Sequence, residues 1–156
     1  MFQIGFYLLF IALFSFAIVL GGIIYQHIVE FPNWNSNIPN SLLSYQNFFS
    51  TSDFGSFFKI FMPLSSICLL ISIIILWNEV ATSWMIAAFV GLLLITIYTR
   101  SYFVPKHQLL FSERVGEIDS SKLKKTANQW KRGNYLRIFI MLATMFTFLK
   151  AYEVLS

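Results

Sequence analysis

IGFYLLFIALFSFAIVLGGIIY, residues 4–25, contains no charged side chain and decides the fold. A helix needs roughly 20 apolar residues to cross the hydrocarbon core of a bilayer, and this run is long enough. Its length and the lack of a positively charged segment before it favour a retained membrane anchor over a cleaved signal peptide. Open strands are excluded in lipid because their unpaired backbone groups are too costly there.

Three more segments are similarly apolar. The chain has 156 residues, of which 12% are charged, whereas soluble domains average about 25%. Its mean hydropathy is +0.68. We therefore predict an all-α fold, a four-transmembrane-helix bundle that forms a single membrane domain over residues 1–156. The predicted spans cover residues 4–26, 57–77, 81–100 and 135–155.

The basic residues are concentrated in one connection. Of the eleven Lys and Arg residues, nine lie between Arg100 and Arg137, and the connections over residues 26–56 and 78–80 have none. Short loops rich in Lys and Arg stay in the cytoplasm. We therefore expect a multi-pass protein of the cell inner membrane with both long connections cytoplasmic and both termini outside. The basic residues are juxtamembrane, which favours anionic lipid headgroups and disfavours nucleic acid as partner.

The two long connections carry local signals. Pro32 is expected to end or bend the first helix, and residues 41–50 have the spacing of a short amphipathic helix lying at the interface. Asp53 is expected to cap the second span. In the third connection, residues 111–126 are expected to form a helix followed by a flexible segment.

Polar and aromatic residues are predicted to converge at the cytoplasmic ends of three helices. Ionisable groups at membrane depth are costly and are usually paired or functional. We expect Glu30 to pair with Arg100 or Arg137. The converging residues are His27, Glu30 and Trp34 after the first span, Arg100 and His107 after the third, and Trp130, Asn134 and Arg137 on one face of the fourth helix.

Each of these residues also has a plainer interpretation. Arg100 and Arg137 can extend to lipid phosphates, and the two Trp residues can belong to the interfacial aromatic belt. No metal and no other cofactor is expected. The alternative is a metal ion bound by His27, Glu30 and His107 as a facial triad. A single cysteine, no Gly-rich phosphate loop and no nucleophile elbow disfavour thiol, nucleotide and hydrolytic chemistry.

Several segments together resemble those of a known family. They are Phe31-Pro-Asn-Trp34, Ser41-Leu-Leu-Ser-Tyr-Gln-Asn-Phe-Phe49, Met62-Pro-Leu-Ser65, Val104-Pro-Lys-His-Gln-Leu-Leu110 and Trp130-Lys-Arg-Gly-Asn-Tyr-Leu-Arg137. Over nearly its whole length the chain resembles the anthrone oxygenase-like family of four-helix membrane proteins. His107 stands where that family often has Asn. The resemblance implies oxidation of anthrones to anthraquinones with molecular oxygen and no bound cofactor.

The leading hypothesis is an oxygenase or oxidoreductase for a flat lipophilic molecule, phenol-like or quinone-like, at the cytoplasmic interface. His27 would be the base, oriented by Glu30, while Arg100 and Arg137 would stabilise the anion. The predicted substrate-binding residues are Trp34, His107, Trp130 and Asn134.

The alternative is a non-catalytic protein that binds lipid or a small molecule, or an accessory subunit, so whether the chain is an enzyme stays open. The polar cluster would then be a structural clamp between helix ends. Membrane lipids and a lipophilic small molecule are the expected partners, and a homo-oligomer is compatible with the pattern.

Overall fold

The computed structural model describes residues 1–112 and 114–156, and it is helical throughout its regular elements. Two π-helices and one 3₁₀-helix interrupt the α-helices. The elements are α1 (Phe2–Tyr25), η1 (Gln26–Glu30), α2 (Phe31–Trp34), α3 (Asn40–Phe48), α4 (Phe54–Ile75), α5 (Thr82–Tyr98), η2 (Thr99–Phe103), α6 (Val104–Leu110), η3 (Val115–Glu117) and α7 (Ser120–Leu155).

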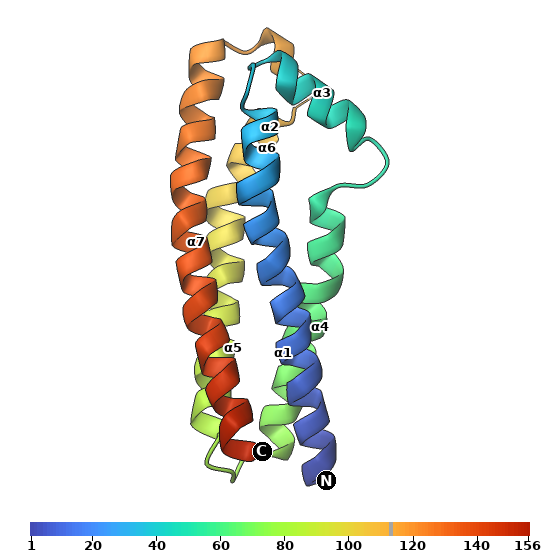
Figure 1. Ribbon diagram of the computed structural model, residues 1–156, viewed down its shortest axis with the longest axis vertical. Helices are drawn as coiled ribbons and strands as arrows, with labels where there is room; N and C mark the ends of the chain where they lie inside the picture. The colour runs from blue at the N-terminus through green and yellow to red at the C-terminus, as the bar shows by residue number, and fades with distance from the viewer. Residues whose placement is uncertain (113) are drawn as a thin grey trace.

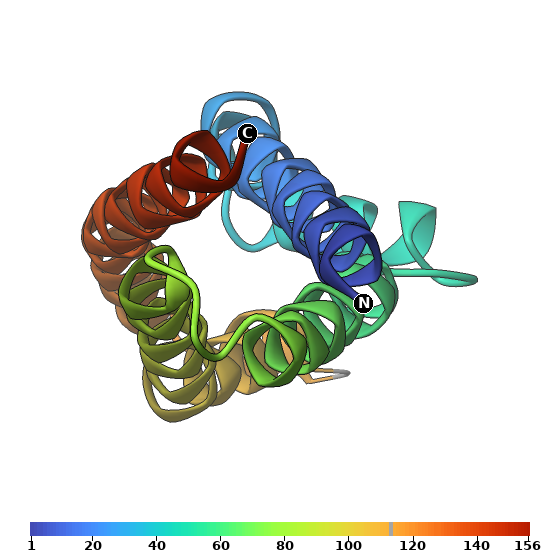
Figure 2. The same ribbon diagram turned by 90° about the horizontal axis from the view of Figure 1, so that it is seen from below.

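Four long rods lie side by side in a bundle (Figure 1). The first rod joins α1, η1 and α2, and the third joins α5, η2 and α6. Within the described part of the chain, four helices are long and apolar enough to cross a membrane. Seen along its axis, the bundle places α1 between α4 and α7, and α5 closes the ring (Figure 2). The predicted four-helix all-α fold is confirmed.

The outer surface of the bundle is apolar. Large side chains such as Phe139, Ile74 and Ile60 point outward and are 63–70% exposed, while Leu9, Phe16 and Phe148 are completely buried between the helices. In water such a surface would be an aggregation liability, whereas lipid tails solvate it. Both chain ends lie at the end of the bundle opposite α2, α3 and α6 (Figure 1).

Buried serines tie α4 to α1. The Ser65 hydroxyl donates to the Ala12 carbonyl at 2.9 Å, and the Ser72 hydroxyl donates to the Gly5 carbonyl at 2.8 Å. Small residues at these positions let the two backbones approach closely, and hydroxyl-to-carbonyl bonds between helices are favourable where water is absent.

The short amphipathic helix predicted over residues 41–50 is present as α3. The prediction for residues 111–126 was wrong, because α7 already begins at Ser120 and runs straight into the fourth span. The first turns of α7 are polar, so hydropathy gave no sign of them. The helix forms there because Asp119 caps it and because Leu123, Ala127 and Trp130 bury one face against α2 and α6.

Gly91 permits the close packing of α5 against α7. A Cβ atom at Gly91 would overlap the Thr144 side chain, including the Cβ of Thr144 at 3.0 Å, so rotation of Thr144 gives no relief. We expect Gly91→Ala to lower the free energy of unfolding by about 1–3 kcal/mol. Gly21→Ala is the matched control, because nothing lies within 4 Å of the added methyl group. Thermal unfolding in detergent micelles measures both, and equal midpoints would contradict this account.

Asp53 caps α4 and makes its stability depend on pH. The Ser56 backbone N–H donates to the Asp53 carboxylate at 2.9 Å and holds the pKa of that carboxyl below its ordinary value. The stabilisation is therefore present at neutral pH and is lost as the pH falls through the folded-state pKa. We expect Asp53→Ala to cost about 1 kcal/mol at pH 7 and less in acid.

Asp53→Asn keeps an acceptor at this position but cannot titrate. It is expected to keep most of the stability and to lose the pH dependence that the cap contributes. The measurement is the unfolding midpoint as a function of pH, followed by circular dichroism. A difference between the wild type and Asp53→Ala that persists unchanged in acid would refute the role of the ionised cap.

Candidate functional site

Two π-helices face α7 at the same end of the bundle. In each, the residue before a proline bonds five residues back: Phe31 N–H to the Gln26 carbonyl, and Val104 N–H to the Thr99 carbonyl. Pro32 and Pro105, which follow, have no N–H to donate. The wider π-turn accommodates the lack of this hydrogen bond, and the helical rod continues. Of the two outcomes that we predicted for Pro32, an end or a bend of the first helix, the end is wrong, because the rod continues to Trp34.

Arg137 is the centre of the hydrogen-bond network at this level. It is only 4% exposed, and its Nε and Nη2 atoms donate to the Asn134 side-chain oxygen at 2.9 and 2.5 Å. Nη2 also donates to the Gln26 side-chain oxygen at 3.4 Å. The guanidinium carbon lies 3.9 Å from the centre of the Phe103 ring, which provides a cation–π contact. Helix α7 is thereby joined to η1 and η2.

This network determines which ring nitrogen of neutral His27 carries the proton. Because the Asn134 oxygen accepts from Arg137, the amide nitrogen of Asn134 must be the donor in its 3.1 Å contact with His27 Nδ1. His27 Nδ1 is therefore an acceptor, and a neutral His27 carries its proton on Nε2. The His27 ring packs edge-on against the Tyr135 ring, with the ring centroids 4.4 Å apart, and His27 is half-buried.

Glu30 and Arg137 do not pair, contrary to our expectation. Across residues 1–112 and 114–156 the one ion pair is Lys150–Glu153 at 2.9 Å. Glu30 is 6% exposed and accepts a 2.6 Å hydrogen bond from the Tyr45 hydroxyl of α3. Burial, followed by this hydrogen bond, raises the pKa of Tyr45, so the phenol stays protonated and donates. Glu30 therefore does not orient His27.

The two predicted tryptophans pack against each other. Trp34 and Trp130 are at most 1% exposed, and their rings meet edge-to-face with centroids 5.5 Å apart. Phe31 stacks on Trp130 at 5.6 Å, and the Trp130 indole N–H donates to His107 Nε2 at 2.8 Å. The rings already fill the space between the helix ends, so a substrate does not fit between these two indoles.

An open groove lies beside this cluster, between η1–α2 and α3. Its volume is about 650 Å³. Its lining combines Glu30 and Tyr45 with further aromatic rings and with amide and hydroxyl groups of α2, α3 and the segment between them. The lining residues are Tyr25, Val29, Glu30, Asn33, Trp34, Ser36, Asn37, Asn40, Ser41, Ser44, Tyr45, Phe48 and Phe49.

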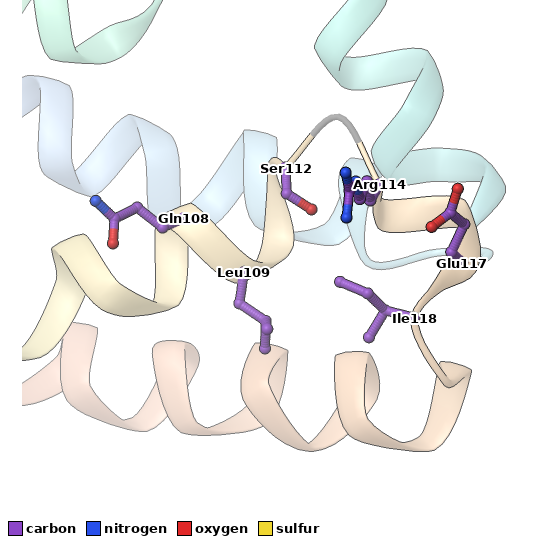
Figure 3. Close-up of a pocket in the computed structure, with 6 residues that line it drawn as sticks. All are labelled: Gln108, Leu109, Ser112, Arg114, Glu117 and Ile118. Atoms are coloured by element: carbon purple, nitrogen blue, oxygen red, sulfur yellow. The ribbon is translucent and has the colours of Figure 1, made fainter.

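A second hollow of about 610 Å³ opens between the end of α6 and the beginning of α7 (Figure 3). None of the predicted site residues lines it; those that do are Gln108, Leu109, Ser112, Arg114, Glu117 and Ile118. Arg100 also lies apart from the network, because its side chain is exposed on η2. We therefore place the candidate site at η1, α3 and the facing part of α7.

A metal ion at His27, Glu30 and His107 finds no prepared site. In the part of the chain that the structure describes, no three His, Cys, Asp or Glu side chains are grouped closely enough to hold one. Each of the three already has a different hydrogen-bond partner, namely Asn134, Tyr45 or Trp130.

Three members of the site escaped the sequence prediction: Gln26, Tyr45 and Phe103. Gln26 lies one helical turn before Glu30, so the two side chains share a face, and both are buried. As an uncharged amide it gave no signal of its own in the sequence. Tyr45 lies within the amphipathic helix predicted over residues 41–50, where helical spacing alone does not reveal the hydrogen bond of its phenol.

The site depends on Asn134, and an alanine there tests the network. Asn134→Ala would leave the buried guanidinium without its main acceptor and His27 Nδ1 without a donor. We expect a loss of roughly 3 kcal/mol in unfolding free energy. Asn134→Asp restores an acceptor for Arg137 and should be clearly more stable than Asn134→Ala. Thermal unfolding of both variants measures the difference, and equal midpoints would show that Arg137 does not rely on residue 134.

Comparison with known proteins adds one match. The chain matches no curated protein and no solved structure. A family model described as anthrone oxygenase matches residues 54–147, which span α4 to most of α7. The match includes Asn134 and Arg137 and begins after Glu30 and Tyr45. It covers more than half of the sequence, so the chain belongs to the anthrone oxygenase family.

Proposed function

We propose that the chain is a membrane oxygenase for a flat lipophilic phenol, or for a ketone such as an anthrone that forms a phenol-like anion. The observation that supports this most directly is the buried Glu30 carboxylate at the groove. Its one side-chain hydrogen bond in the described structure comes from Tyr45, and no basic side chain pairs with it. Such a carboxylate, in a groove with aromatic walls, suits a general base for a weakly acidic aromatic substrate.

Glu30 would remove a proton from the substrate, giving an anion that reacts with oxygen. For an anthrone, the ring methylene loses two hydrogens and gains one oxygen atom, while the second atom of O₂ leaves as water. Tyr45 would hold the carboxylate in place before the proton transfer. Its hydroxyl would also be free to donate to the anion once Glu30 is protonated.

Arg137 would stabilise the negative charge from behind the groove. Gln26, which accepts from Arg137, is on the same π-helix as Glu30. All hydrogen-bond partners of this buried guanidinium are neutral, so none of them cancels its charge. In a medium of low dielectric constant such a charge acts strongly on a nearby anion. Asn134 would orient the guanidinium, and Trp34 would form part of the wall. The proposal gives Arg100 no catalytic role.

The orientation of the protein follows the positive-inside rule. We propose that the α2, α3 and α6 end of the bundle faces the cytoplasm and that both termini lie outside the inner membrane. The basic residues between Arg100 and Arg137 belong to this end, and the α1–α4 connection on the same side has no acidic residue other than Glu30 and Asp53. The groove would then open at the cytoplasmic interface, where a lipophilic substrate arrives from the lipid.

Glu30→Gln tests the base directly. We expect oxygen consumption with an anthrone to fall at least about a hundredfold, because the amide cannot accept the proton. Tyr45→Phe keeps the ring in the groove and should lose less. His27→Ala is the contrasting variant, since the sequence-based hypothesis makes His27 the base; here it should retain turnover within a few-fold.

Purified protein in micelles and an oxygen electrode give the rates, and thermal unfolding confirms that each variant folds. If His27→Ala lost turnover while Glu30→Gln kept it, His27 and not Glu30 would be the base. A folded wild type that neither consumes oxygen nor converts any anthrone or phenol would favour the non-catalytic binding protein.

A further inference from the structure

The first rod, which begins with α1, and α7 run side by side (Figure 2). Where η1 and α2 of this rod meet α7, basic and polar side chains form a patch. Lys131 places its ammonium group 5.6 Å from the centre of the Phe31 ring, and Phe31 stacks with His27 at 6.3 Å. Tyr135, one turn further along α7, contacts the His27 ring. Lys131, His27 and Tyr135 therefore form one surface, which we call the α1–α7 seam. It does not belong to the groove.

The seam is positively charged and has no acidic neighbour on its two helices. From Ser120 to Tyr152 the sequence of α7 contains no Asp or Glu, and from the N-terminus the first acidic residue is Glu30. Glu30 is buried and is bonded to Tyr45 on the α3 side. Behind the seam lies the buried Arg137. The surface therefore favours an anion.

His27 presents a donor rather than an acceptor at the seam. The chain of hydrogen bonds from Arg137 through Asn134 ends at His27 Nδ1, so the remaining N–H of the imidazole is on Nε2. Lys131 adds a mobile ammonium group, and Tyr135 adds a hydroxyl. These three donors lie at the level where the polar part of α7 passes into its apolar part. Together they suit the oxygens of a phosphodiester.

An apolar stripe continues from the seam along α7. Tyr135, Phe139 and Leu142 are 57%, 70% and 50% exposed. Their spacing of four and three residues keeps them on the face that carries Lys131. A ligand that fits this surface has an anionic head and an extended apolar tail.

We propose that the α1–α7 seam binds an anionic phospholipid. Lys131 and the His27 Nε2–H hold the phosphate, and an acyl chain lies along Phe139 and Leu142. A zwitterionic lipid fits less well, because its ammonium group would be brought to a surface that already carries Lys131 and has Arg137 behind it. This site is independent of catalysis in the groove.

Native mass spectrometry of the purified chain, with phosphatidylglycerol and phosphatidylcholine as competing probes, tests the proposal. The wild type is expected to retain phosphatidylglycerol preferentially, and Lys131→Gln should weaken its binding about fivefold. Lys122→Gln removes the same charge from the opposite face of α7, about two and a half turns away, and should leave the affinity unchanged.

Thermal unfolding in a neutral detergent confirms that both variants fold. If Lys131→Gln and Lys122→Gln weakened phosphatidylglycerol binding equally, the binding would be explained by general charge attraction. The proposal of a defined site would then be wrong. No preference for phosphatidylglycerol in the wild type would overturn it too. Inorganic phosphate that displaces the lipid fully would assign the seam to a free anion and would contradict a lipid ligand.

Discussion

The hydrogen bonds between Arg137 and Asn134 hold the candidate-site end of this bundle together. A guanidinium in a helix that crosses lipid must be desolvated, and the cost is tolerable only when its donors find acceptors. Asn134, one turn away on the same helix, supplies the nearest acceptor, and Gln26 supplies one from the first rod. The Phe103 ring covers the cation from the third rod. Three of the four rods are thus fixed relative to one another by a single side chain.

The same hydrogen bonds have a chemical consequence. Since the Asn134 oxygen is occupied by Arg137, the amide nitrogen is committed to His27, and the imidazole is committed to one tautomer. The buried positive charge also stays uncompensated, because Glu30 is turned toward α3 and Tyr45. A buried charge that forms no ion pair is costly to keep in a medium of low dielectric constant. Such an arrangement is typical of sites where charge is needed by a ligand or a reaction rather than by the fold.

Composition predicted the bundle well and the site only in part. Long uncharged runs identify membrane helices reliably, because lipid leaves the backbone no alternative to a helix. The polar turns from Ser120 onward have no such signature, and their helix follows from the packing of Leu123, Ala127 and Trp130. The predicted pairing of Glu30 with an arginine failed for a related reason. Opposite charges at one membrane depth indicate attraction, but the direction of each side chain depends on the helix register.

That register is set by the two π-turns. A proline inside a membrane helix removes one hydrogen bond, and the wide turn before it shifts all later side chains around the axis. Within η1, Gln26 and Glu30 are buried, and His27 is half-buried. One five-residue element thereby serves three places: Gln26 faces Arg137, Glu30 faces the groove and His27 faces the seam with α7. The groove on one side of this rod and the cationic seam on the other thus share residues of a single short element.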